Sequence, residues 1–398
     1  MHIECIGVVM KKIIYGFLLI FIALGVAFFG FAPGFVESKM NRVRVHQPYV
    51  VSKASQQVHD KLIVGDWHAD TLLWNRDLRE RGSYGHVDLP RLREGNVAFQ
   101  VFTVVTKSPA GQNYRANPSD ARDRITPLLI AQLWPPKTWG SLFERALFQA
   151  QKLEETAQKA PEELIIVETR KDLRDVLEMR REGKEVIGGL IGLEGAHALL
   201  ANMENLDALF EAGYRVIGLQ HFFDNALGGS LHGVSGKGLT PFGRAVVQGL
   251  MERGMVIDLA HSSPQVAKDV LAMVNVPVVN SHTGIYSHCN SARNISDELM
   301  KGIAQTGGVI GIGYWKTVVC DDSPAGVAAT IKAAVDLVGV DHVSLGSDYD
   351  GSVTTSFDSS ELAVLTHELR VLGFDGEALE KIMGGNMIRV LNQVLPEE

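Results

Sequence analysis

The chain has 398 residues, a formal net charge of -8 at pH 7 and a sequence pI of ≈ 5.9. Its lysines and arginines are scattered, so the sequence lacks the clustered basic surface that nucleic-acid binding requires. Three cysteines are too few for a disulfide scaffold or a thiolate metal site. Because Cys5 precedes an apolar segment, at most one bridge, Cys289 to Cys320, is possible in the globular part, and the sequence leaves its formation open.

The first element predicted from the N-terminus is a membrane span. Residues 13–36 (IIYGFLLIFIALGVAFFGFAPGFV) carry no charged side chain and follow Lys11 and Lys12. At about 1.5 Å per residue, a helix of this length crosses a hydrocarbon core of about 30 Å. A cleaved signal peptide is the alternative, because residues 25–27 (GVA) have the small side chains of a cleavage site. The longer apolar run favours an uncleaved anchor over residues 1–36.

Charges on the two sides of this span bear on its orientation. The two lysines before it are followed on the far side by Lys39, Arg42 and Arg44, which weaken the positive-inside asymmetry. We favour a single-pass anchor with a short cytoplasmic N-terminus and a catalytic body outside the cytoplasm, in the periplasm or the extracellular space. Residues 37–58 are expected to act as a linker to the main domain, residues 59–398.

From about residue 60 onward, short β-rich runs alternate with longer amphipathic segments. Eight runs are predicted as strands: residues 62–68, 97–105, 186–194, 215–221, 255–261, 276–282, 308–314 and 342–348. Several are continuous apolar runs, as expected for parallel strands covered on both faces, and helical patterns separate most of them. Eight such units predict an α/β fold of the (β/α)8, or TIM barrel, type.

One connection in this pattern is much longer than a crossover needs. Residues 107–185 lie between the second and third predicted strands, and Pro135-Pro136 interrupts them. We expect a helical insertion over the barrel mouth. Residues 375–395 are predicted to add a terminal helix.

Side chains of the metal-binding and catalytic types recur where the predicted strands end. His68 and Asp70 follow the first strand, and five further residues close later strands: Glu194, His221, His261, His282 and Asp348. In a parallel barrel these ends converge on one face, so the side chains are expected to be neighbours in space. Imidazoles and carboxylates are the ligands of zinc and similar divalent cations, and a carboxylate such as Glu194 can bridge two ions.

Each of these residues also has a plainer interpretation. A lone histidine at a strand end is more often structural than a ligand, and Glu194 could cap a turn. The joint placement of five ligand types favours a binuclear metal site, where a water between two cations becomes a nucleophile near neutral pH. His197 is expected to be structural. Six further histidines are expected to be ordinary loop or surface residues: His59, His86, His232, His288, His342 and His367.

A series of short motifs runs from about residue 60 to the C-terminus: DWHAD, HVDLPRLREGNVAFQVF, GLEGAH, GLQH, MVIDLAHSS, PVVNSHTGIYS, RNISDELM and LGSDYDG. In these motifs and their order the chain resembles the membrane dipeptidase (renal dipeptidase) family of zinc metallopeptidases. The resemblance implies hydrolysis, by a metal-bridging hydroxide, of dipeptides with a free C-terminal carboxylate. It also implies two Zn²⁺ per chain. Matched residue by residue, His68 and Asp70 bind one ion, His261 and His282 bind the other, and Glu194 bridges both.

The same resemblance assigns the substrate contacts. It implies that His221 lies on the substrate carbonyl, that Arg293 holds the C-terminal carboxylate and that Asp348 transfers the proton. These side chains suit such roles, since a guanidinium matches a carboxylate, an imidazole can stabilise an oxyanion and a carboxylate can carry a proton. A surface salt bridge is the plainer interpretation of Arg293. Asp350 is the rival of Asp348, in a turn beyond the strand.

Two positions depart from the family pattern. Asp224 stands where an asparagine is expected, and Trp74 lies one position later than the usual aromatic residue. Both are expected to line the substrate pocket, so the preferred dipeptide stays open.

Two other functions compete with that of a dipeptidase. A binuclear amidohydrolase acting on another small amide, such as an N-acyl amino acid, would have little use for Arg293. A membrane-tethered binding protein on an inactivated barrel is disfavoured, because every ligand type is intact. The expected partners are a small dipeptide and the bilayer, with a homodimer as an open alternative to a monomer and no nucleic acid.

Overall fold

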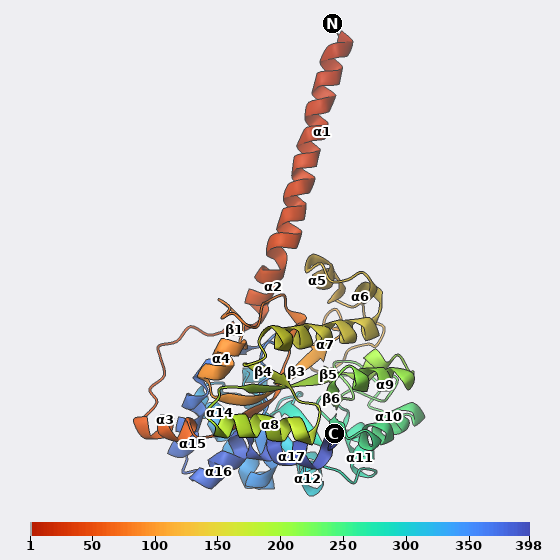
Figure 1. The fold of residues 1–398 in the computed structure, drawn as a ribbon. Coiled ribbons are helices and arrows are strands. Elements are labelled where there is room, and N and C mark those ends of the chain that lie inside the picture. The colour runs from red at the N-terminus through yellow and green to blue at the C-terminus, as the bar shows by residue number, and fades with distance from the viewer. Residues whose placement is uncertain (1) are drawn as a thin grey trace.

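The computed structural model describes residues 2–398, with side chains from residue 10 onward. Its centre is a closed barrel of eight parallel strands surrounded by helices (Figure 1). In order around the barrel these are β2 (Val64–Ala69), β3 (Val97–Val105), β5 (Ile187–Glu194), β6 (Tyr214–Gly218), β7 (Val256–Asp258), β8 (Val279–Thr283), β9 (Val309–Ile312) and β10 (Val343–Leu345). Because β10 pairs with β2 and β3 pairs with β5, the predicted (β/α)8 barrel is confirmed.

Each predicted run contains one barrel strand, but several strands end earlier than expected. The runs 215–221, 255–261 and 342–348 each continue three residues beyond β6, β7 and β10. At two of these ends the backbone leaves the extended conformation, since His261 and Asp348 have φ angles of 62° and 59°. The functional side chains at these positions therefore lie on the loops directly after the strands.

Three short strands were not predicted. β4 (Leu164–Ile166) pairs with the N-terminal end of β5, and β1 (Arg42–Val43) pairs with β11 (Thr354–Thr355). Each has only two or three residues, which is too short for an alternating pattern to be visible in the sequence.

Alternating side chains of the strands divide the core into two layers. Val101 of β3 and Leu190 of β5 pack in one cluster with α17 (Asn386–Val394), whereas Phe102 and Ile191 pack in the larger cluster beneath the outer helices. The terminal helix predicted over residues 375–395 consists of α16 (Gly376–Glu380), one π-helical turn and α17. In Figure 1, α17 lies at the end of the barrel opposite the N-terminal helix.

The outer helices begin where the sequence provides capping residues. Thr240, Ser263 and Ser323 each precede a proline and accept a hydrogen bond from the third helical N–H, which starts α10, α11 and α14. The outer helices between the strands are α4 (Leu89–Glu94), α9 (Glu204–Glu211), α10 (Pro241–Glu252), α11 (Pro264–Leu271), α12 (Asp297–Gln305), α13 (Lys316–Val319), α14 (Pro324–Val338) and α15 (Ala363–Val371).

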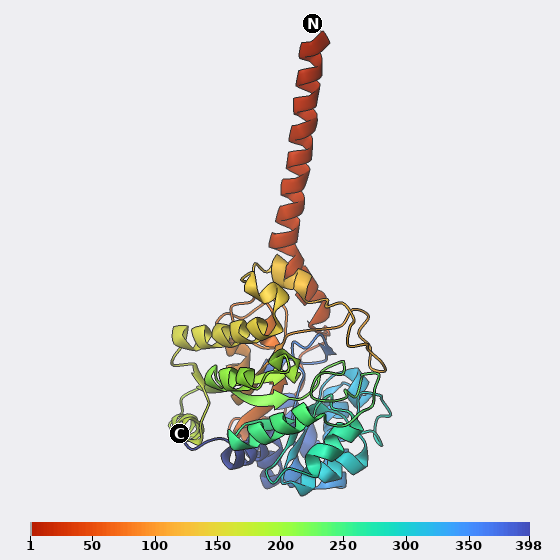
Figure 2. The ribbon, with the colours of Figure 1, turned by 90° about the vertical axis from the view of Figure 1, so that its right-hand side faces the viewer.

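The N-terminal segment is one long helix that projects away from the barrel (Figures 1 and 2). It comprises α1 (His2–Val26), a π-helical turn (Ala27–Phe31) and α2 (Ala32–Met40). From Met10 to Met40 it is long and apolar enough to cross a membrane, and its apolar stretch is not buried in the protein. The predicted span 13–36 lies inside this range.

The predicted linker, residues 37–58, is packed onto the barrel domain. Glu37 is 2% exposed and forms an ion pair with Arg76. β1 pairs with β11, and α3 (Lys53–His59) packs against α15. His59 is buried, with ring nitrogens 2.9 Å from Thr366 Oγ1 and 3.1 Å from the Gly95 carbonyl. The expectation that His59 is an ordinary loop or surface residue is therefore wrong, because polar partners satisfy it inside.

The long insertion has two parts. α5 (Thr126–Ala131) and α6 (Lys137–Gly140) lie beside α2 at the barrel mouth, and Pro135-Pro136 separates them (Figure 1). α7 (Leu142–Lys159) and α8 (Arg170–Arg181) instead pack on the outside of the barrel, against β4 and the barrel strand β5. Only the first part therefore covers the mouth. Elsewhere in the barrel domain, Cys289 and Cys320 form a disulfide, while the Cys5 side chain lies outside the described part.

Candidate active site

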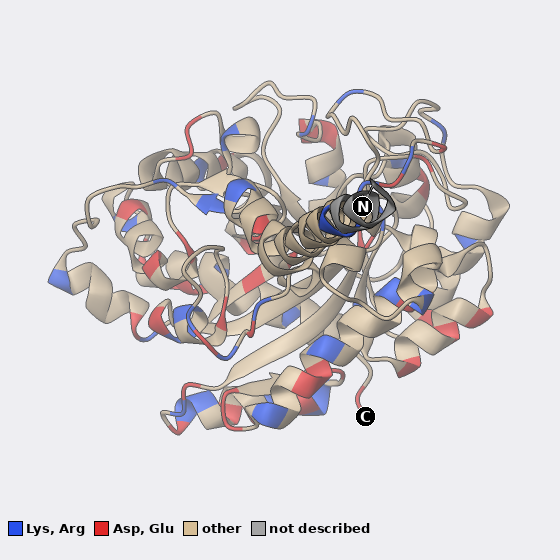
Figure 3. Ribbon diagram, turned by 90° about the horizontal axis from the view of Figure 1, so that it is seen from above, with Lys and Arg blue, Asp and Glu red and all other residues tan. Residues whose placement is uncertain are grey.

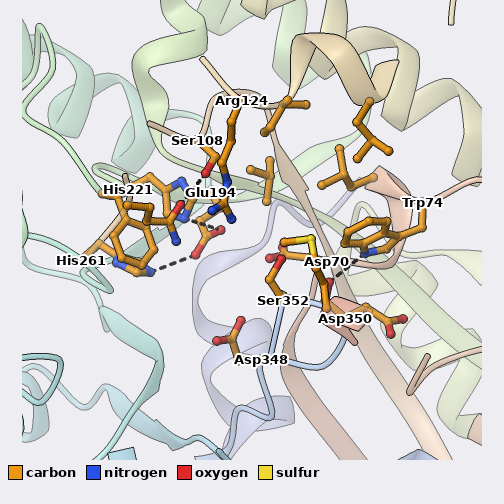
Figure 4. Close-up of a pocket in the computed structure, with 18 of the residues that line it drawn as sticks. Asp70, Trp74, Ser108, Arg124, Glu194, His221, His261, Asp348, Asp350 and Ser352 are labelled. Atoms are coloured by element: carbon orange, nitrogen blue, oxygen red, sulfur yellow. Dashed lines mark hydrogen bonds and ion pairs between the residues drawn. The ribbon is translucent and has the colours of Figure 1, made fainter. Parts of the chain in front are cut away.

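The predicted metal ligands lie together at the mouth of the barrel, around the carboxylate of Glu194. Figure 4 shows Glu194 with two of them, Asp70 and His261. Its Oε1 lies within reach of three imidazole Nε2 atoms: 3.0 Å from His261, 3.3 Å from His282 and 3.5 Å from His68. Asp70 completes the cluster, with its Oδ1 3.4 Å from His68 Nε2. The prediction that side chains at the strand ends are neighbours in space therefore holds for residues at the ends of β2, β5 and β8 and in the loop after β7.

These five residues form two overlapping groups of three. One group contains His68, Asp70 and Glu194, and the other contains Glu194, His261 and His282. Within each group the ligand-type atoms all lie within 4.8 Å of one another. Glu194 belongs to both groups, which is the position of a bridging carboxylate. A third group joins Asp348 to the two histidines of β2 and β8.

A tight turn aims Glu194 into the mouth. Gly195 follows it with φ 91°, and a Cβ at that position would lie 2.5 Å from the His197 ring. Only glycine adopts this conformation freely in so little space. His197 packs behind the turn, where its Nε2 lies 2.8 Å from Thr106 Oγ1.

Two buried hydrogen-bond networks hold the histidines in orientation. Ser281 Oγ donates to Asp258 Oδ2 at 2.6 Å and lies 2.8 Å from His282 Nδ1. Asp66 Oδ1 accepts the backbone N–H of His68 at 3.0 Å. Ser281 thus fixes the His282 ring through Nδ1 and leaves Nε2 for a metal, whereas Asp66 fixes the backbone of His68. We did not predict Asp66, Asp258 or Ser281, although an aspartate inside an otherwise apolar strand is a signal of a buried polar network.

The protonation behaviour of the cluster suits a cation. Burial lowers the pKa of His261 and His282 well below the ordinary value, so both rings are neutral. Burial, with Asp70 adding to it, raises the pKa of Glu194. Burial alone would lower the pKa of His68, but Asp70 and Glu194 raise it to about 10. The carboxylates therefore attract a cation, and the neutral imidazoles of His261 and His282 can ligate it. This set of nitrogen and oxygen donors fits Zn²⁺.

Asp348 and Asp350 have opposite environments. Burial, opposed by His68 and assisted by Asp70, raises the pKa of Asp348 to about 8. Burial would also raise the pKa of Asp350, but Arg76 and His86 outweigh it and hold that pKa below the usual range. The Asp350 carboxylate is an ion-pair partner of Arg76 and accepts the His86 backbone N–H at 2.8 Å.

Two further predicted residues adjoin the cluster. His221 Nε2 lies 3.1 Å from Glu194 Oε2, and its Nδ1 lies 3.3 Å from the Lys107 carbonyl, so the ring faces an acceptor on each side. Burial lowers the pKa of His221 to about 4. Arg293 is buried; its Nη2 donates to the His282 carbonyl at 2.8 Å, and its Nη1 has no partner in the part of the chain that the structure describes.

A cavity of about 480 Å³ opens onto these groups. One side is polar, with Glu194, His221, His261 and Arg293, and Figure 4 shows that Trp74 lies on the opposite side. The apolar lining consists of Leu73, Trp74, Val105, Ile125, Leu128 and Phe222, together with Val36 and Met40 of α2. The insertion adds polar residues that we did not predict, Ser108, Tyr114 and Arg124, because a long loop has no pattern that fixes its path.

The two departures from the family pattern have different positions. Trp74 lines the cavity, and its Nε1 donates to the Asp350 carbonyl at 2.8 Å. Asp224 is not among the cavity-lining residues. Its carboxylate accepts the backbone N–H groups of Ser230 and Val234 at 2.8 and 3.0 Å and so fixes a loop. The expectation that Asp224 lines the pocket is therefore wrong.

Two histidines expected to be ordinary loop or surface residues are buried beside the site. His86 contacts Asp350, with its Nδ1 3.2 Å from the carboxylate. The His232 ring lies 5.2 Å from that of His261, and its Nδ1 lies 3.0 Å from the Tyr114 carbonyl. The sequence prediction was wrong because polar groups from distant segments contact Nδ1 of each ring inside the protein.

A (β/α)8 barrel whose mouth gathers imidazoles and carboxylates around one glutamate defines a metal-dependent hydrolase. Residues 52–396 match the family model described as membrane dipeptidase (peptidase family M19), and the chain belongs to this family. It is a metallo-dipeptidase that acts on small peptide substrates.

Curated relatives and a solved structure agree with this assignment. The chain is 27% identical over 364 residues to the dipeptidase aclJ of Aspergillus oryzae, covering 85% of this chain and 80% of the relative. It is 30% identical over 322 residues to the dipeptidase tcpJ of Claviceps purpurea, covering 78% and 69%. A Rhodobacter sphaeroides metallopeptidase, crystallised with a phosphinate mimic of L-Ala-D-Ala, shares the fold with a TM-score of 0.67 and 22% identity over 84% of this chain and 99% of that one.

Proposed function

We propose that the chain is a zinc-dependent dipeptidase for dipeptides with a free C-terminal carboxylate. The observation that carries the proposal is the position of Glu194, shared by two groups of ligand-type atoms and next to a cavity of about 480 Å³. A cavity of this size accommodates a small peptide.

The cluster has the residues to hold two zinc ions. His68 and Asp70 would hold one ion, His261 and His282 the other, and Glu194 both. When bound, the ions supply a water that ionises near neutral pH and a Lewis acid for the peptide carbonyl.

Three side chains would act directly on the substrate. The unpartnered Nη1 of Arg293 is free to take the C-terminal carboxylate, which explains a permanent cation buried at the cavity. His221 would donate a hydrogen bond from Nε2 to the carbonyl oxygen as negative charge develops there. Asp348 would accept the proton of the attacking water and deliver it to the leaving nitrogen, so no covalent enzyme intermediate is needed.

The proposed setting is a single-pass anchor with the barrel outside the cytoplasm. The apolar helix supports membrane anchoring, and the Cys289–Cys320 disulfide supports an oxidising compartment.

The test uses the full chain in detergent, because α2 contributes Val36 and Met40 to the cavity. Bound metal is counted by mass spectrometry, and hydrolysis of L-Ala-D-Ala and Leu-Ala is compared with that of their C-terminal amides. We expect two zinc ions per chain, cleavage of the free dipeptides only, and loss of activity in Glu194→Gln. We expect Arg293→Met to raise KM for the free dipeptides while binding both metals.

Equal cleavage of the amides would favour a general amidohydrolase. A metal-free chain that stayed inactive after zinc was restored would overturn the catalytic proposal. Light scattering on the same preparation distinguishes a homodimer from a monomer.

A further inference from the structure

We propose that residues 126–140, which form α5, α6 and the turn between them, contact the lipid bilayer directly and hold the barrel mouth against its surface. The partner is the lipid itself, both headgroup and acyl chain. The inference does not depend on the dipeptidase reaction; it depends on the position of this segment beside the N-terminal helix.

The first observation is the contact between α5 and the apolar helix. α5 packs against α2 and also against the π-helical turn Ala27–Phe31. That turn lies inside the segment that is long and apolar enough to span a membrane. Between residue 31 and residue 36, where the predicted span ends, the helix rises about 7–8 Å. α5 therefore reaches the depth of the outer acyl chains if the span occupies the bilayer.

The second observation is the chemistry of the segment. Its sequence, TPLLIAQLWPPKTWG, contains no acidic residue and one basic residue, Lys137. Leu133 is 71% exposed and Trp139 is 38% exposed, and Phe35 of α2, the helix against which α5 packs, is also exposed. Large apolar side chains gathered at one end of a protein mark an interaction surface. Leucine and tryptophan are the side chains that enter the membrane interface most readily.

Leu133 has an unfavourable backbone conformation that no packing of its side chain in the protein interior offsets. Its φ angle is 58°, in the left-handed region that costs a leucine energy, yet its side chain points away from the core. The indole N–H of Trp139 donates to the Trp134 carbonyl at 3.0 Å, which leaves the apolar part of its ring for an outside contact. Contact with acyl chains would bury the apolar surface of both residues and offset the cost of the Leu133 backbone conformation.

Basic residues follow the predicted span and therefore lie further from the hydrocarbon core than its last apolar residues. Lys39, Arg42 and Arg44 follow the span and are exposed. This is the position at which cations meet anionic headgroups. Figure 3, which looks down the helix onto the barrel, shows the N-terminal helix standing over the body of the protein. The cavity, which α2 helps to line, therefore opens at the membrane surface, and substrates would reach it there.

Intrinsic fluorescence can test the contact without a label. The chain has five tryptophans, and all except Trp139 are 4% exposed or less. The full chain is reconstituted in vesicles of phosphatidylcholine and phosphatidylglycerol, with and without brominated acyl chains, which quench only nearby indoles. We expect clear quenching of the wild type and at least a twofold smaller quenched fraction in Trp139→Phe. Equal quenching in both proteins, or none in either, would overturn the proposal.

A second measurement uses fluorophores at single cysteines in a Cys5→Ser background. Leu133→Cys carries the fluorophore on the turn between α5 and α6. Val371→Cys is the matched control, because Val371 is an exposed apolar residue on α15, at the other end of the barrel. Phe21→Cys marks the apolar helix. We expect a lipid-borne quencher to act several-fold more strongly at positions 21 and 133 than at position 371. Quenching at position 133 no stronger than at position 371 would contradict the contact, whether or not position 21 is quenched.

Discussion

At the scale of single residues, Asp348 and Asp350 show how two neighbouring carboxylates acquire different tasks. Both follow β10 with φ angles near 60°. Asp350 is fixed by Arg76 and His86 and so stays ionised, which suits a structural anchor. Asp348 instead faces His68, whose Nε2 lies 3.9 Å from its Oδ1, and burial still raises its pKa, which suits a group that gains and loses a proton.

Asp348→Asn is expected to lower kcat by about 10²–10⁴-fold, because it removes proton transfer. KM and the metal content should change little. Steady-state kinetics and metal analysis of the purified variant check this. Loss of one zinc ion together with activity would instead identify Asp348 as a ligand, which is the alternative that its place beside His68 and His282 offers.

His197 is expected to make the fold sensitive to acid. Burial, with His221 adding to it, lowers the His197 pKa from 6.5 to about 3. The folded state therefore binds fewer protons than the unfolded state between these values. The contribution to stability is complete above pH 6.5 and is lost progressively as the pH falls toward 3.

We expect the free energy of unfolding to fall by up to about 2 kcal/mol more in the wild type than in His197→Gln between pH 7 and pH 5. Denaturant titrations of both proteins at the two pH values measure the difference. Parallel pH dependence in the two proteins would refute the assignment.

At the scale of elements, the barrel strands were predictable and the surrounding segments were less so. β3 was predicted with its observed bounds because its apolar run is long and ends where the chain turns. β7 has three residues of an expected seven, because the chain turns away before His261. The grouping of the imidazoles and carboxylates around Glu194 was predictable from the strand ends, since a parallel barrel brings such ends together. Tyr114 and Arg124 could not be placed, because only tertiary packing brings their loop to the mouth.

The helix α2 belongs to two parts of the molecule. Its first turns continue the apolar span, while Val36 and Met40 line the cavity. Glu37, between them, pairs with Arg76, which also pairs with Asp350. The apolar N-terminal helix is thereby tied to the loop that carries Asp348.

Met40→Ala is expected to lower kcat/KM for dipeptides with a large apolar N-terminal residue, such as Leu-Ala, by about 5- to 20-fold. If Arg293 holds the C-terminus, the N-terminal side chain lies toward the apolar lining, and about 1–2 kcal/mol of contact is lost. Ala-Ala should be nearly unaffected. Phe35→Ala, on the same helix but outside the cavity, is the matched control. An equal effect of Met40→Ala on both substrates would argue against this orientation.

At the scale of the whole molecule, the disulfide closes the chain around the substrate side of the barrel. The loop between Cys289 and Cys320 contains Arg293, α12 and β9. A cross-link of this kind limits the unfolded chain more than the folded one. In an oxidising compartment it would hold the predicted carboxylate-binding arginine on a stable segment.

Replacing both cysteines in Cys289→Ser/Cys320→Ser is expected to lower the free energy of unfolding by about 3–4 kcal/mol, since the bond closes a loop with a sequence separation of 31. Thermal unfolding with and without a reductant measures it. The reductant should lower the Tm of the wild type and leave that of the double variant unchanged. A reductant effect of equal size in both would point to another cause.

The path of α2 also bears on how the protein could be released from its anchor. A proteolytic cut after residue 40 would remove Val36 and Met40 from the cavity wall and Glu37 from Arg76, in addition to freeing the barrel. Such a cut would thus alter the shape of the pocket. It would also remove the ion pair through which Glu37 and Arg76 hold the loop that carries Asp348 and Asp350. A released form of this dipeptidase would differ from the anchored form in what it cleaves as well as in where it is found.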